Sequence, residues 1–293
     1  MDSDKIDPRI FDLYDQYCHS DMERREFLNR AAAITVAGGS GLAMAQAMLP
    51  RYAYASVVSF NDSRIKATYV SYDSPGGNGD KIRGYLVQPR GNGPFPSVLV
   101  VHENRGLNPY IKDVARRLAI EGFLALAPDG LSPLGGYPGN DDDGKKMQRK
   151  LDRGKIIVDM LNGAKFLKKH KLSNGKLGVT GFCFGGQATN LLAVGLGADL
   201  QAASPYYGRA PKTADVPKIQ APLLIHYAED DKRVNATRAA YEAALKANGK
   251  TYEMHTYPGT RHGFHNTSTP RHNEAQAKIA WDRTIAFFKK HLS

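Results

Sequence analysis

The residues best suited to chemistry in this 293-residue sequence surround one cysteine. Cys183 lies within Gly181-Phe182-Cys183-Phe184-Gly185-Gly186, between a β-forming run that ends at Thr180 and a helical run that begins at Gln187. Glycines two residues either side of a nucleophile suit a sharp strand-to-helix turn, because that turn imposes strained backbone angles and leaves no room for neighbouring side chains. The pattern predicts a nucleophile elbow with cysteine in place of serine.

An acid and a histidine follow the cysteine in the chain order of a triad on an α/β fold. The apolar run at residues 222–228 predicts a buried strand, and it ends in Glu229, Asp230 and Asp231, where an acid could orient a histidine. After the alternating run 252–258, a glycine-bracketed loop supplies His262 as the natural base. A free cysteine has a pKa near ~8.5, so a thiol nucleophile needs such a base at neutral pH.

Each of these residues has a simpler interpretation. Cys183 could be a small buried apolar side chain, and His262 could be a loop histidine that faces solvent. His102 and His265 raise the question of a metal, but no third ligand accompanies them at a recognisable spacing. We therefore expect neither a metal nor another cofactor.

The chain resembles the dienelactone hydrolase (carboxymethylenebutenolidase) family of cysteine α/β-hydrolases, from about Lys66 to the C-terminus. Besides the elbow, the matching segments are Val100-Val101-His102-Glu103-Asn104-Arg105-Gly106, Arg117-Leu118-Ala119, Gly122-Phe123, Ala127-Pro128-Asp129, Tyr206-Tyr207-Gly208 and Pro258-Gly259-Thr260-Arg261-His262-Gly263-Phe264.

The resemblance implies Cys183 as the nucleophile, His262 as the base and Asp231 as the acid, because Asp231 has the family's spacing and its two acidic neighbours do not. It further implies that Glu103 pairs with the resting thiol, although a strand-end glutamate could also simply face water. The same resemblance implies an oxyanion hole built from the backbone N–H groups of Phe184 and Asn104.

The chain departs from the family pattern in substrate binding. The family has an arginine shortly after the catalytic histidine, whereas residues 263–267 here contain no cation. Arg105 and Arg261 could replace it if they turn inward, with solvation at the surface as the alternative. Tyr207 is a further candidate for substrate contact. Hydrolysis is therefore expected, but dienelactone itself is in doubt as the substrate.

The order of elements predicts an α/β-hydrolase fold, a mostly parallel sheet with helices on both faces and no cap domain. We expect a β-hairpin at 65–72 and 81–88, strands at 97–101 and 123–127, and helices at 109–121, 142–169 and 237–247. The loop at 131–143 is expected to border the active site.

Residues 1–55 form a different kind of segment from residues 56–293, the hydrolase domain. Arg24 and Arg25 resemble a twin-arginine export motif, and an Ala/Gly-rich stretch and Ala53-Tyr54-Ala55, a small-x-small cleavage site, follow in order. This order predicts a periplasmic protein. The alternative is a retained helix, cytoplasmic or membrane-associated, because residues 11, 14, 18 and 22 recur at helical spacing and acids are frequent.

The net charge of +11 favours acidic substrates, and scattered lysines without a binding motif argue against a nucleic-acid partner. Cys18 and Cys183 are the only cysteines, so no structural disulfide is expected; a homo-oligomer is possible. Three functions remain open: a hydrolase of lactones or small activated esters, a thioesterase or broad carboxylesterase on the same triad, or a catalytically silent binding protein.

Overall fold

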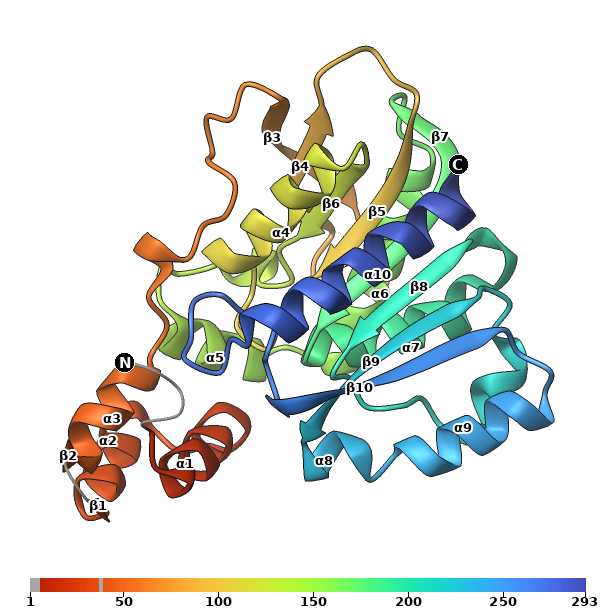
Figure 1. The fold of residues 1–293 in the computed structure, drawn as a ribbon. Coiled ribbons are helices and arrows are strands. Elements are labelled where there is room, and N and C mark those ends of the chain that lie inside the picture. Colours follow the sequence, from red (N-terminus) through yellow and green to blue (C-terminus); the bar gives the residue numbers. More distant parts are fainter. Residues whose placement is uncertain (1–5, 37–38) are drawn as a thin grey trace.

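An eight-stranded sheet forms the centre of the molecule in a computed structural model that describes residues 6–36 and 39–293 (Figure 1). The strand order is β10-β9-β8-β7-β5-β6-β4-β3, and only the pairings made by β4 are antiparallel. The strands are β3 (Ile65–Asp73), β4 (Lys81–Pro89), β5 (Phe95–Val101), β6 (Leu124–Pro128), β7 (Ser173–Phe182), β8 (Ala202–Tyr206), β9 (Leu223–Asp230) and β10 (Tyr252–Arg261). The predicted hairpin and the mostly parallel sheet are confirmed.

The two faces of the sheet are buried under separate groups of helices. Along β5, Val98 and Val100 enter one apolar cluster while Leu99 and Val101 enter the other, as the alternation of side chains in a strand requires. Helices α4 (Pro109–Ile120) and α10 (Glu274–Leu292) cover the first face. The second is covered by α6 (Arg153–Lys168), α7 (Phe184–Leu196) and α9 (Arg238–Ala247).

The single helix expected over 142–169 is wrong, because the structure has two helices there. Helix α5 (Asp141–Arg149) ends before α6 begins, and the side chain of Asp152 accepts a hydrogen bond from the Lys155 N–H as the N-cap of α6. An N-cap of this kind begins a new helix, which is why the chain breaks at residues 150–152. The remaining elements outside the N-terminal residues are α8 (Lys232–Asn235) and short 3-10 turns at Tyr52–Tyr54, Ser132–Leu134, Gly197–Asp199 and Thr213–Lys218.

The N-terminal residues form a small helical unit with a core of its own. Its elements are α1 (Pro8–His19), α2 (Arg24–Ala32), α3 (Gly41–Met48) and the two-residue strands Thr35–Val36 and Gly39–Ser40. The rings of Tyr17 and Phe27 stack at 4.9 Å in the centre of this core. Figure 1 shows these helices (red and orange) near α5 and the lower ends of the strands. Among the described residues, no helix is long and apolar enough to cross a membrane.

Candidate active site

Cys183 stands at a tight corner between β7 and α7. Its φ is +58°, one of two positive φ values among the described non-glycine residues. A Cβ at Gly181 would clash with the carbonyl of Gly185, and a Cβ at Gly185 would clash with the carbonyl of Val101. Both glycines of the motif are therefore required for the close approach of the backbone segments, as expected for a strained elbow.

His262 and Asp231 meet close to this corner. Asp231 follows β9 and caps α8, and its Oδ2 lies 2.5 Å from Nδ1 of His262, which follows β10. The other two acids have different partners: Asp230 pairs with Arg261 at 2.8 Å, and Glu229 accepts a hydrogen bond from the Gly259 N–H. Of the three acids that the sequence offered, only Asp231 lies against His262.

The electrostatics of this group favour a thiolate beside an imidazolium. Burial alone would raise the pKa of the Cys183 thiol, but the charge of His262 and the hydrogen-bond contact with His19 outweigh it and hold the pKa well below its ordinary value. Burial likewise opposes the charged form of His262, yet the charges of Cys183 and Asp231 raise its pKa to about 10. The thiol and the imidazole therefore support each other's charged state.

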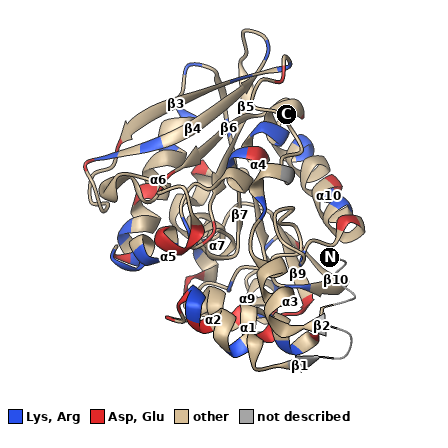
Figure 2. Ribbon diagram, turned by 90° about the vertical axis from the view of Figure 1, so that its left-hand side faces the viewer, with Lys and Arg blue, Asp and Glu red and all other residues tan. Residues whose placement is uncertain are grey.

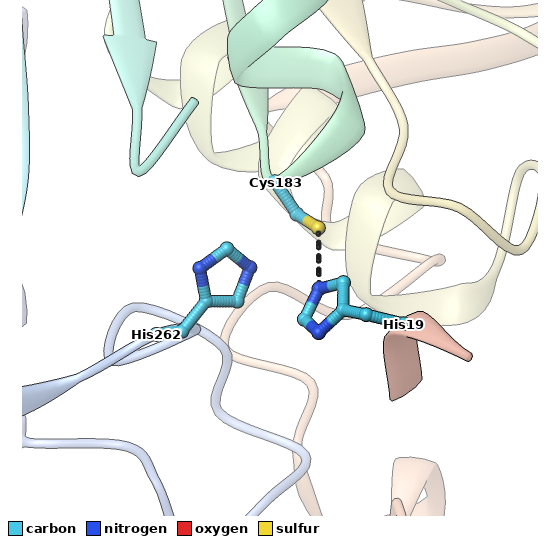
Figure 3. Close-up of side chains that lie close together, drawn as sticks. All are labelled: His19, Cys183 and His262. Carbon is cyan, nitrogen blue, oxygen red and sulfur yellow. Dashed lines mark hydrogen bonds between the residues drawn. The ribbon is translucent and has the colours of Figure 1, made fainter. Parts of the chain in front are cut away.

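A second histidine lies beside the thiol. Nε2 of His19, the last residue of α1, is 3.5 Å from Cys183 Sγ, and the rings of His19 and His262 lie edge to face at 4.9 Å (Figure 3). The apolar spacing of residues 11, 14, 18 and 22 indicates this helix, but nothing in that pattern marks His19. Its position depends on where the helix docks.

Glu103 is buried beside the thiol. Its carboxylate is buried and accepts a hydrogen bond from Asn266 Nδ2 at 3.0 Å, while the hydrogen-bond contact of the thiol in the described chain is with His19. Burial, followed by the charge of Cys183, raises the pKa of Glu103 to about 7. Glu103 therefore lies in the site, close enough to feel the charge of Cys183, and its pairing with the resting thiol stays a prediction.

The two histidines first considered for a metal are used elsewhere. His102 accepts a hydrogen bond from the Gly130 N–H at 3.0 Å and faces the carbonyl of Glu103. His265 is buried and contacts the hydroxyl of Tyr110 at 2.7 Å. Both side chains therefore hold neighbouring segments in place.

A cavity of about 310 Å³ opens beside Cys183. Its lining includes Cys183 together with Phe184, Asn104 and Tyr207. The last three are the residues predicted for the oxyanion hole and for substrate contact, and they share this cavity with the thiol. None of the described residues around it is acidic, and five are cations: Lys145, Arg149, Arg153, Arg209 and Arg233. The basic residues of α5 follow an acidic first turn, which appears in red beside them in Figure 2.

The two arginines expected to bind substrate lie outside this cavity. Arg105 is buried, as the inward alternative required, but it donates a hydrogen bond to Cys18 Sγ and faces Asp141 at 3.6 Å. Arg261 is partly exposed and pairs with Asp230. Arg233 carries no signal in the sequence that marks it for the site. Its guanidinium lies 3.1 Å from His19 Nε2 because the chain turns into α8 at the Asp231 cap.

The strand order, the helices on both faces and the strand-to-helix elbow define an α/β-hydrolase with a cysteine at the nucleophile position. The dienelactone hydrolase family model matches residues 82–292, so the chain belongs to that family. It is an enzyme that hydrolyses ester bonds, and a small-molecule ester or lactone is its substrate class. A second model, described as YqhI-like, matches residues 1–36.

Individual relatives agree with this assignment. A Yersinia pestis protein named "Putative carboxymethylenebutenolidase" is 30% identical over 73% of this chain and 85% of its own length. The "Putative hydrolase fragment YghX" of Escherichia coli K12 is 56% identical, over 39% of this chain and 97% of the fragment. Among solved structures, the "Putative Dienelactone Hydrolase" of Klebsiella pneumoniae has a TM-score of 0.66 and 29% identity, over 77% of this chain and 99% of that one.

Proposed function

We propose that the chain hydrolyses lactones and small activated esters through a Cys183–His262–Asp231 triad and a thioester intermediate. The Cys183 thiolate attacks the ester carbonyl, and the tetrahedral intermediate collapses as His262 gives its proton to the departing alkoxide. His262 then takes a proton from water, which attacks the thioester and releases the acid. The thiolate and the imidazolium are restored at the end of the cycle.

The observation that carries this proposal is the arrangement of His262 between an acid and the thiol. Its Nδ1 is held by Asp231, and its buried Nε2 has no hydrogen-bond partner among the described residues. The reactive atoms of His262 and Cys183 lie within 4.8 Å of each other, so the free nitrogen can serve the sulfur or a leaving group beside it.

The oxyanion hole belongs to the same proposal. Phe184 is the first residue of α7, so its N–H has no partner within the helix, and Asn104 lines the same cavity as the thiol. Backbone donors at these positions would stabilise the tetrahedral oxyanion, with each donor contributing roughly 2.7–4 kcal/mol in comparable sites.

The substrate is proposed to carry a negative charge. Five cations around a cavity with no acid among its described lining residues create a positive potential, which attracts anions and orients them near the nucleophile. Arg209 is exposed at this cavity and follows the Tyr206-Tyr207-Gly208 segment, so it can contact a carboxylate without being part of the triad.

A matched pair of substrates tests this function. The purified protein is assayed with neutral and carboxylate-bearing versions of the same aryl ester, and with the corresponding lactones. We expect kcat/KM to favour the anionic version. Arg209→Gln should remove up to about fivefold of that preference while leaving the neutral ester within a factor of ~2, as for one exposed charge pair. No turnover of any ester or lactone would refute the function, whereas equal rates would refute only the charge preference.

We infer that residues 6–55 are retained in the working enzyme. Support comes from buried contacts: Lys145 Nζ donates to the carbonyls of Tyr17 and Met22 at 2.8 and 2.9 Å, and Asn104 Nδ2 donates to the carbonyl of Cys18. The carbonyl of Ala55, at the predicted cleavage point, accepts a hydrogen bond from Thr267. Export with cleavage remains a prediction that no contact here tests.

N-terminal sequencing of the protein from its native cells distinguishes the two alternatives. Retention gives a terminus at Met1 or Asp2, which lie outside the described residues, and export with cleavage gives Ser56. A terminus at Ser56 would also remove His19 from the active site.

A further inference from the structure

The structure brings together three side chains with the chemistry of a metal site. Cys183 Sγ and one ring nitrogen each from His19 and His262 all lie within 4.8 Å of one another, and they come from three separate parts of the chain (Figure 3). Zn²⁺ binds thiolate at about 2.3 Å and imidazole at about 2.0–2.1 Å, so tetrahedral ligand atoms stand roughly 3.3–3.6 Å apart. The distance of 3.5 Å between Cys183 Sγ and His19 Nε2 already has this value.

Both imidazoles are oriented as metal ligands usually are. Nδ1 of His19 contacts the backbone carbonyl of Asp15 at 2.9 Å and its carboxylate at 3.2 Å, and Nδ1 of His262 contacts the carboxylate of Asp231. Metal-binding histidines typically donate their second ring N–H to a carboxylate or carbonyl, which directs the other nitrogen to the metal. In both rings that other nitrogen is Nε2, on the side of the thiol.

An unpartnered nitrogen provides a second, independent observation. His262 is only 5% exposed, and its Nε2 has no hydrogen-bond partner among the described residues. A buried ring nitrogen of this kind is costly unless a ligand or a reacting group uses it. The adjoining cavity leaves room for a water or another ligand in a fourth position, as in zinc sites with three protein ligands.

We propose that Cys183, His262 and His19 form a site for a soft divalent cation of the Zn²⁺ class. Binding forms one sulfur–metal and two nitrogen–metal bonds and releases the protons that the ligands carry. No electron is transferred. A bound cation occupies the sulfur, so the same event stops nucleophilic attack by the thiol and makes hydrolysis reversibly sensitive to the metal.

One neighbouring group opposes the cation. The guanidinium of Arg233 lies 3.1 Å from His19 Nε2, so it donates to a lone pair that the metal requires. It also lies 3.5 Å from His262 Nδ1. The Arg233 side chain borders the open cavity and can turn into it. Arg233→Gln is therefore expected to tighten metal binding, and weaker binding in that variant would contradict the site.

Metal binding is measured directly on the full-length, metal-stripped protein. Zn²⁺ is titrated against a chromogenic chelator, and Co²⁺ serves as a spectroscopic probe through its thiolate-to-cobalt charge-transfer band. We expect one equivalent bound, loss of the band in Cys183→Ala, and an affinity at least about 100-fold lower in His19→Gln, beyond the ~10–100-fold typical of losing an outer partner. Cys18→Ala, which removes the other thiol, is the matched control and should keep both the stoichiometry and the band.

Asp15→Asn keeps the test informative if His19→Gln does not fold. It leaves all three ligands in place and removes one acceptor of the His19 ring, so we expect an affinity about 10–100-fold lower. Equal affinity in wild type and His19→Gln, or no binding by wild type at micromolar Zn²⁺, would overturn the proposal. These readouts do not depend on turnover, so they remain decisive even if the proposed hydrolytic mechanism fails.

Discussion

The sheet domain and the N-terminal helical unit each bring one histidine to the sulfur of Cys183. Different interactions hold the histidine of each region in place. In the sheet domain, fully buried apolar side chains on both faces of the strands fix the positions of Cys183, Asp231 and His262. The N-terminal unit has a separate apolar core. Polar and cation–aromatic contacts join it to the sheet domain.

These contacts rely mainly on cations of the sheet domain. Lys145 donates to carbonyls at and just beyond the end of α1, where a helix leaves backbone acceptors unpaired. The guanidinium groups of Arg271 and Arg261 lie 4.8 Å from the ring centres of Tyr14 and Phe11. The sheet domain alone therefore builds the proposed triad, whereas His19 reaches the thiol only while the helical unit is docked.

Replacing each histidine in turn gives the largest expected difference between the two regions. His262→Ala should lower kcat by about 1,000-fold, within the range for a positioned general base. His19→Ala should lower it by less than about tenfold, because its Nδ1 faces the Asp15 carbonyl and its Nε2 accepts from Arg233. Steady-state kinetics with an activated ester measure both. Equal losses would show that the helical unit supplies a catalytic base.

The two adjacent acids provide a sharper test within the sheet domain. Asp231→Asn should reduce kcat by about 100-fold, because an amide holds the wrong tautomer of His262 while Oδ1 still caps Val234. Asp230→Asn removes only the partly exposed pair with Arg261 and should change kcat by less than about threefold. Thermal melting controls for folding. The reverse order of effects would assign the triad acid to Asp230.

A substitution in the core of the helical unit tests the stability of that unit more than it tests catalysis. Phe27 is fully buried there, so Phe27→Ala should destabilise that unit by about 3–5 kcal/mol. We expect faster proteolysis and hydrogen exchange in residues 6–49, with an unchanged melting transition for the sheet domain and kcat within about tenfold. Loss of the main transition would mean that the two regions fold as one unit.

Much of the sheet domain could be predicted from the sequence because its signals are local. The glycines at the elbow, the apolar runs of the strands and the loop after β10 each act within a few residues. The break between α5 and α6 was missed because the cap at Asp152 interrupts an otherwise helical run. For Arg105 the sequence left an inward and a surface position open. Its contacts with Cys18 and Asp141 bury it, and that arrangement depends on residues far apart in the sequence.

The central claim, that Cys183 carries the acyl group, is tested most directly by trapping the intermediate. The full-length protein is mixed with excess activated aryl ester, quenched in acid within the first turnover, and digested for mass spectrometry. The account predicts one acyl group per chain on the peptide that contains Cys183, none on the peptide that contains Cys18, and neither adduct nor turnover in Cys183→Ala. Steady turnover by Cys183→Ala, or an acyl group on another residue, would contradict it.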